Sequence, residues 1–384
     1  MTINEIKTPS YVIDEDRLVK NLEILRDVEK RTGCKILLAQ KAFSNFCEYP
    51  LISKYISGTT ASGLFEARLG KEEMNKENHV FSPAYKMEDM KELVKICDHI
   101  VFNSVSQLLK YKELCISSSV SIGLRVNPEC STQGEHAIYD PCAVGSRLGV
   151  TLDNLLKAGE DVLQGVEGIH FHTLCEQNSD DLFTTLKAVE EKFGKYLGKM
   201  KWVNFGGGHH ITRSDYDIEK LVECVLHIKN TYDVQVYLEP GEAIALNAGY
   251  LVTEVLDKVE NGITTLILDA SAACHMPDVL EMPYNPPLKA AKKIENIEEA
   301  ARNGRYAYRL SSFTCLAGDI IGDYEFDKEI NVGDKLIFED MAIYSIVKNN
   351  TFNGIPLPSI ARMRDGECSI VKEFGYEDFK GRLS

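Results

Sequence analysis

Short apolar runs of strand length alternate with amphipathic helical patterns between residues 14 and 246. Each run is followed by apolar residues at helical spacing or, at the eighth run, by a turn. The eight strand candidates lie at 35–41, 58–62, 79–82, 99–103, 120–126, 166–172, 202–205 and 234–238. Eight strands that alternate with helices predict an α/β fold with a (β/α)8 TIM-type barrel. A doubly wound open sheet is the competing arrangement.

The pattern changes after about Asn247, where strand candidates continue and helical spacing becomes sparse outside 286–303. The later candidates lie at 251–255, 264–269, 306–310, 335–338 and 342–347. One more candidate, 10–13, precedes the barrel and is able to join this second group. We therefore predict a barrel domain over residues 14–246 and a mostly β domain, barrel-like or sandwich-like, over residues 1–13 and 247–384.

Composition narrows the class of protein but carries little chemistry. The 384 residues are 44% hydrophobic and 26% charged, and no apolar run reaches membrane-spanning length. The N-terminus lacks the features of a signal peptide, so we expect a cytoplasmic protein. The eleven cysteines form no CxxC pair, which favours buried thiols over disulfides. The net charge of −15 argues against nucleic-acid binding and is compatible with a cationic substrate, although solubility explains it equally well.

Reactive side chains are expected at the C-terminal ends of barrel strands. The first run ends on Lys41. Burial there would lower the pKa of the amine and favour Schiff-base formation with a carbonyl, such as that of pyridoxal phosphate. The alternative is a lysine that extends to water. The sixth run ends on His172, which would lie against an aromatic cofactor or serve as a core histidine.

The seventh and eighth runs lead into a glycine triplet and an acidic turn. Gly206-Gly207-Gly208 offers backbone N–H groups for a phosphate, although such triplets are also common in tight turns. Glu239 is suited to hold a proton on a pyridine nitrogen, or to cap a turn.

Taken in order, these motifs resemble those of the fold-type III pyridoxal-phosphate enzymes, which include alanine racemase, diaminopimelate decarboxylase and the eukaryotic-type ornithine decarboxylases. The resemblance extends to the second domain. Ser312–Asp319 is similar to the decarboxylases' cysteine motif, and Ala342-Ile343-Tyr344 followed by Phe352-Asn353-Gly354 is similar to their tyrosine motif. The resemblance implies a homodimer with shared active sites. It also implies pyridoxal phosphate held by Lys41, His172, Gly207, Gly208, Glu239 and Tyr344, with Cys315 from the partner subunit as the proton donor.

Two departures from the usual family pattern point to one branch. Glu242 stands where the family usually has arginine, and Leu316 follows Cys315 where an acid is usual. Together with the segment 274–278, these features resemble the carboxynorspermidine/carboxyspermidine decarboxylases of polyamine biosynthesis. That resemblance implies a substrate with a cationic tail bound by Glu242, Asp278 and His275, with Arg147 near the site. For Glu242 a structural ion pair, and for Asp278 a helix cap, are the alternatives.

Three other functions fit parts of the pattern. A diaminopimelate or ornithine/arginine-type decarboxylase of the same fold is disfavoured by Glu242. A zinc-dependent barrel hydrolase would use His170, His172 and Cys175, with His209-His210 and Cys274-His275 as further candidates, but its HxH pair belongs on the first strand. A pyridoxal-phosphate carrier without enzymatic activity generally lacks the second domain. No metal is expected in the favoured interpretation.

Overall fold

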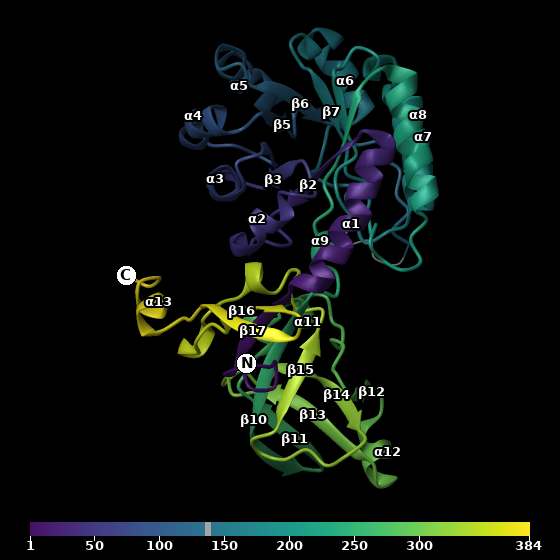
Figure 1. Cartoon of the computed structure of the whole chain (residues 1–384). Helices are drawn as coiled ribbons and strands as arrows, with labels where there is room; N and C mark the ends of the chain where they lie inside the picture. The colour runs from purple at the N-terminus through teal and green to yellow at the C-terminus, as the bar shows by residue number, and fades with distance from the viewer. Residues whose placement is uncertain (135–139) are drawn as a thin grey trace. The chain divides into compact units, whose positions relative to one another are not determined.

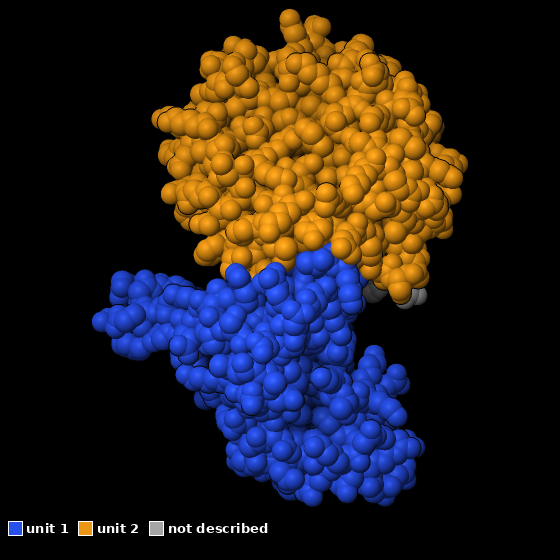
Figure 2. Space-filling model, in the orientation of Figure 1, with its two compact units in different colours: residues 1–20, 245–384 blue, residues 21–244 orange. Residues whose placement is uncertain are grey.

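The structure is a computed structural model that describes residues 1–134 and 140–384. The chain forms two compact units, residues 21–244 and residues 1–20 with 245–384 (Figures 1 and 2). That residues 14–246, and residues 1–13 with 247–384, form separate domains stays a prediction. Among the described residues, no helix combines the length and the apolar character that a membrane span requires.

The larger unit is a closed barrel of eight parallel strands, which confirms the predicted fold class. The strands are β2 (Lys35–Ala39), β3 (Gly58–Ala61), β4 (Glu77–Ser82), β5 (His99–Phe102), β6 (Ser121–Arg125), β7 (Gly168–His170), β8 (Trp202–Asn204) and β9 (Gln235–Leu238). Pairing of Lys35 with Tyr237 closes the barrel between its first and last strands. The strands are almost wholly buried, as expected where helices cover a parallel sheet.

Helices precede, connect and follow the barrel strands (Figure 1). They are α1 (Glu15–Thr32), α2 (Tyr49–Ile52), α3 (Leu64–Leu69), α4 (Met87–Ile96), α5 (Val105–Ser117), α6 (Leu152–Ala158), α7 (Ser179–Leu197), α8 (Ile218–Tyr232) and α9 (Glu242–Ala245). Shorter helical segments are η1 (Phe46–Glu48), η2 (Gly70–Met74) and η4 (Glu160–Leu163). Polar caps fix where several helices begin; the side chain of Ser104, for example, accepts a hydrogen bond from the Gln107 N–H.

The smaller unit is mostly β, as predicted, and the N-terminal strand joins its sheet. The strand order is β12-β14-β13-β11-β10-β1-β16-β17, with β15 paired to β10. These strands are β1 (Ser10–Asp14), β10 (Gly249–Asn261), β11 (Ile263–Leu268), β12 (Ala291–Lys293), β13 (Tyr306–Ser312), β14 (Ile320–Phe326), β15 (Lys335–Glu339), β16 (Ser359–Arg364) and β17 (Glu367–Lys372). The helical segments are α10 (Ala272–His275), α11 (Asp278–Glu281), α12 (Ile297–Arg302), η5 (Ile346–Lys348), η6 (Phe352–Gly354) and α13 (Tyr376–Lys380).

One predicted strand of the smaller unit is wrong. Residues 342–347 form bends that lead into η5 instead of an extended segment. Tyr344 has a φ of 50°, a left-handed conformation that an extended strand does not contain.

Candidate active site

A pocket of about 690 Å³ opens at the C-terminal ends of the barrel strands. Its volume lies in the range of small-molecule sites. The charged and polar side chains that line it include Lys41, Arg125, Arg147, His170, His172, Cys175 and Glu239. The fold thus brings together four of the residues predicted from the sequence, Lys41, Arg147, His172 and Glu239.

Lys41 lies in a turn two residues beyond the end of β2, so the strand stops earlier than the apolar run suggested. Solvent reaches its side chain through the open pocket, while protein atoms surround it on the other sides. Burial lowers the pKa of the Lys41 amine, and the positive charge of Arg125 lowers it further, against an opposing effect of Glu239. A lowered pKa enlarges the fraction of neutral, nucleophilic amine.

Glu239 follows β9 and is held by two donors, one from the adjacent strand β8 and one from β7 beyond it. Asn204 Nδ2 donates to Oε1 at 2.8 Å, and His170 Nε2 lies 3.2 Å from Oε2. Burial raises the pKa of Glu239, but the interactions with His170 and Asn204 outweigh it and bring the pKa to about 2. Burial lowers the pKa of His170, so we assign it as a neutral imidazole that donates Nε2–H. Glu239 is therefore an ionised carboxylate in the pocket.

His172 is held by one hydrogen bond to its ring and one to its backbone. Its Nδ1 accepts a hydrogen bond from the Gly207 N–H at 3.2 Å, and its carbonyl oxygen accepts one from Arg125 at 3.3 Å. Burial, followed by the charges of Lys41 and Arg125, holds the pKa of His172 well below its ordinary value. The ring is therefore neutral, and because Nδ1 accepts, its proton is on Nε2.

The glycine triplet between β8 and the following loop has no room for side chains. A Cβ on Gly206 would lie 2.6 Å from the Phe171 carbonyl oxygen, and one on Gly208 would lie 2.1 Å from that of Leu174. Both glycines also have positive φ, 70° and 81°. Without side chains on these glycines, backbone N–H groups are accessible at this end of the barrel, and such groups are suited to bind a phosphate.

Arg125 is a pocket residue that the sequence analysis missed. It ends β6, is 4% exposed, and its guanidinium carbon lies 4.6 Å from the centre of the Phe81 ring. Its Nε makes no hydrogen bond within the described residues, which leaves a buried donor at the pocket wall. The strand-end rule that selects Lys41 also selects Arg125 and Asn204.

Glu242 starts α9, with Oε2 3.0 Å from His210 Nε2. The remaining predicted residues, Cys315, Tyr344, His275 and Asp278, belong to the smaller unit. The Cys315 side chain is exposed, and its N–H donates to Asn353 Oδ1 at 2.9 Å. The roles of Cys315 and Tyr344 stay predictions.

Two of these residues have contacts that favour structural roles. His275 has no exposed surface; its Nδ1 accepts from the Ser271 N–H, and its Nε2 lies 3.2 Å from the Pro356 carbonyl oxygen. Asp278 forms an ion pair with Lys348, which also contacts Glu281. Their predicted contact with a substrate tail has no support from these arrangements.

The ligands expected for a zinc hydrolase do not converge. Over residues 1–134 and 140–384, two groups of three potential ligands lie close together, Glu77 with His79 and His99, and Glu176 with His210 and Glu242. Neither group contains His170, His172 or Cys175, although the second contains His210, one of the further candidates.

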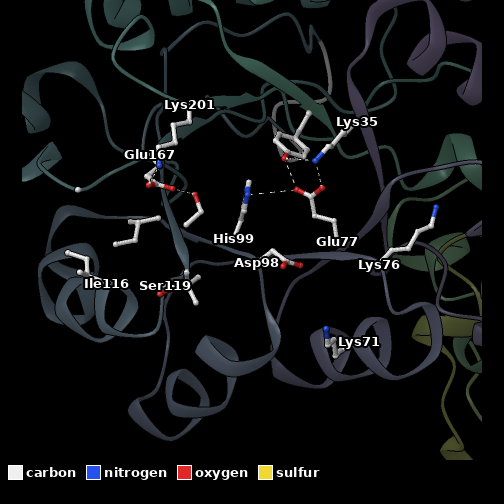
Figure 3. Close-up of a pocket in the computed structure, with 15 residues that line it drawn as sticks. Lys35, Lys71, Lys76, Glu77, Asp98, His99, Ile116, Ser119, Glu167 and Lys201 are labelled. Carbon is white, nitrogen blue, oxygen red and sulfur yellow. Dashed lines mark hydrogen bonds and ion pairs between the residues drawn. The ribbon is translucent and has the colours of Figure 1, made fainter.

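A second pocket, of about 920 Å³, lies at the opposite, N-terminal ends of the strands (Figure 3). Its charged groups are largely paired with one another. Lys35 Nζ is 2.6 Å from Glu77 Oε2, and Lys201 pairs with Glu167. His79 and His99 stack at 4.0 Å, and their Nε2 atoms lie 3.0 Å and 3.8 Å from the same oxygen, Glu77 Oε1. This end of a barrel commonly serves stability.

Comparison with known proteins identifies a family whose chemistry fits the Lys41 pocket at the C-terminal ends of the barrel strands. The family model described as "Pyridoxal-dependent decarboxylase, C-terminal sheet domain" matches residues 10–342. A Campylobacter jejuni protein named carboxynorspermidine/carboxyspermidine decarboxylase is 44% identical over 389 aligned residues that cover 100% of both chains. A Synechocystis protein named carboxyaminopropylagmatine decarboxylase is 39% identical over 385 residues, 99% of this chain and 96% of that one. The crystal structure of carboxynorspermidine decarboxylase from Campylobacter jejuni, complexed with norspermidine, matches with a TM-score of 0.89 at 43% identity, over 98% of this chain and 100% of that one.

Proposed function

Because this chain belongs to the pyridoxal-dependent decarboxylase family, we propose that it decarboxylates carboxynorspermidine and carboxyspermidine to norspermidine and spermidine. The observation that carries this proposal is Glu242, a carboxylate that starts α9 directly after Gly241, which packs against the Lys41 turn. A carboxylate favours a cationic tail over an anionic one. We place the activity in cytoplasmic polyamine biosynthesis.

The residues of the Lys41 pocket fit pyridoxal phosphate. Bound there, the cofactor supplies an electron sink for the bond that breaks to release CO2. Lys41 would attach it covalently, and the ionised Glu239 has lone pairs left to hold a proton on the pyridine nitrogen. His172, neutral and fixed by Gly207, would lie against the ring. The backbone around Gly207 and Gly208, with Tyr344, would hold the phosphate.

Protonation of the α-carbon after CO2 release needs an acid. We propose Cys315 in this role, contributed by the second subunit of a homodimer. Its side chain is exposed in the single chain, as a residue that acts in a neighbouring subunit requires. Arg147 at the pocket wall would help to position the substrate.

A decarboxylation assay across several amino acids tests this proposal. The substrates are carboxynorspermidine, carboxyspermidine, carboxyaminopropylagmatine, diaminopimelate and ornithine, with CO2 release as the readout and Lys41→Ala as the inactive control. We expect turnover of the first two. Release only from diaminopimelate or ornithine would overturn the substrate assignment. Preference for carboxyaminopropylagmatine would favour the activity for which the Synechocystis relative is named.

A further inference from the structure

Three loops of the barrel bring Glu176, His210 and Glu242 together. Glu176 follows β7, His210 follows β8 and Glu242 starts α9, so three successive strand ends contribute one residue each. Their potential ligand atoms all lie within 4.8 Å of one another. Two carboxylates this close repel each other, and a cation bound between them lowers that repulsion.

His210 supplies an independent sign that the cluster takes a ligand. The side chain is 6% exposed, and neither ring nitrogen makes a hydrogen bond within the described structure. Nε2 lies 3.0 Å from Glu242 Oε2, but the two atoms are not aligned for a hydrogen bond. Buried polar atoms are nearly always partnered. An ammonium group has up to three N–H donors, and the carboxylates of Glu176 and Glu242 offer acceptors for them.

The cluster lies beside the Lys41 end of the pocket. Gly241, next to Glu242, packs so closely on the Lys41 turn that a Cβ would lie 2.6 Å from Ala42 Cβ. Cys175, next to Glu176, lines the pocket itself. Burial raises the pKa of the Cys175 thiol, Glu176 and Glu242 raise it further, and Lys41 lowers it. The charges of the cluster and of Lys41 thus both affect the pKa of the same thiol, which indicates that the cluster and the lysine lie near each other.

We infer that Glu176 and Glu242, with His210 as a positioning residue, bind an ammonium group in the tail of the substrate. This inference rests on the proposed function and extends it, since Glu176 and His210 have no role in the cofactor chemistry. No sequence motif singles out Glu176 or pairs it with His210. A divalent metal ion is the other cation that such ligands accept.

Steady-state kinetics of Glu176→Gln test the inference. Glu176 is exposed, so its substitution leaves folding intact, and Glu113→Gln on α5, also exposed, is the matched control. For carboxynorspermidine we expect the KM of Glu176→Gln to rise about tenfold with kcat nearly unchanged, because one charged acceptor is lost. We expect His210→Gln to show the same split between KM and kcat, and Glu113→Gln to match the wild type.

The possible outcomes separate this inference from the proposed function. Unchanged KM values in both Glu176→Gln and His210→Gln, with an active wild type, would overturn the inference alone. Stoichiometric divalent metal in the purified enzyme, lost in Glu176→Gln, would also overturn it. If the wild type released no CO2 from either carboxypolyamine, the proposed function would fail. Calorimetric binding of norspermidine would then still decide the inference, which requires about tenfold weaker binding in Glu176→Gln.

Discussion

His170 Nε2 lies 3.2 Å from Glu239 Oε2, across the intervening strand that carries Asn204. Asn204 donates to the other oxygen, so each oxygen of the carboxylate has one donor. The arrangement keeps a buried acid ionised, which is the state that a protonated pyridine nitrogen requires.

Replacement of Asn204 by leucine is expected to raise the pKa of Glu239 from about 2. The reason is that burial raises this pKa and the Asn204 hydrogen bond, which lowers it, is lost. Loss of one hydrogen bond to a charged group corresponds to about one to two pKa units. Activity needs the ionised form, so the acid limb of the kcat/KM profile is expected to move to higher pH. The measurement is CO2 release against pH, with the exposed Asn154→Leu as control. An acid limb that stays in place would contradict this role of Asn204.

Arg125 is expected to tune the reactivity of Lys41. Its positive charge lowers the pKa of the Lys41 amine, so Arg125→Met raises that pKa and leaves less neutral amine at pH 7. The rate at which apoenzyme takes up pyridoxal phosphate is then expected to fall near neutral pH and to recover at higher pH. Stopped-flow absorbance measures this rate. Arg125→Lys keeps the charge and should retain most of the wild-type profile; equal shifts in both variants would argue against an electrostatic effect.

The glycine triplet gives a stability prediction with a matched control inside the same unit. Gly208 and Gly165 have almost the same φ, 81° and 80°, but a Cβ on Gly208 would lie 2.1 Å from a backbone oxygen, whereas one on Gly165 would meet only side-chain atoms at 3.4 Å. Alanine at Gly165 should cost about 1 kcal/mol for the left-handed backbone. Alanine at Gly208 should cost about 1 to 3 kcal/mol more, because backbone must move.

Denaturant unfolding followed by Trp202 fluorescence measures both costs, since this is the one tryptophan of the chain and it lies in the barrel. Similar costs at Gly208 and Gly165 would show that the close approach to Leu174 relaxes easily. Loss of cofactor affinity in Gly208→Ala alone would support the phosphate-binding role of this segment.

The sequence predicted the barrel because eight short, largely buried strand candidates alternate with helical patterns, even where a strand such as β3 contains threonines. The smaller unit was harder to predict. β14 alternates buried residues with Asp323 and Glu325, which weakens the apolar signal. The strand predicted at 342–347 failed because apolar composition does not report the left-handed conformation of Tyr344.

The candidate site was predictable one residue at a time but not as a network. Strand ends identified Lys41, His172 and Glu239 without any knowledge of register. The donors to Glu239 depend on which residues of neighbouring strands lie side by side, and His170 opposes Asn204 only once the strands pair. A single sequence does not contain that register.

The last prediction concerns Cys315 and the homodimer. Cys315→Ala should lower kcat about 100-fold or more through loss of the proton donor, while thermal stability stays unchanged because the side chain is exposed. Lys41→Ala should be inactive alone. If each site combines Lys41 of one subunit with Cys315 of its partner, mixing the two variants under conditions that exchange subunits forms hybrid dimers with one intact site.

Random exchange should then restore about a quarter of the wild-type activity, because half the dimers are hybrids and each has one working site of two. The measurement is CO2 release before and after exchange. Cys47→Ala serves as a control cysteine and should behave as the wild type on its own. Failure of the mixture to regain activity, with subunit exchange verified by mass spectrometry, would show that Lys41 and Cys315 of the same subunit act together, or that Cys315 has no catalytic role.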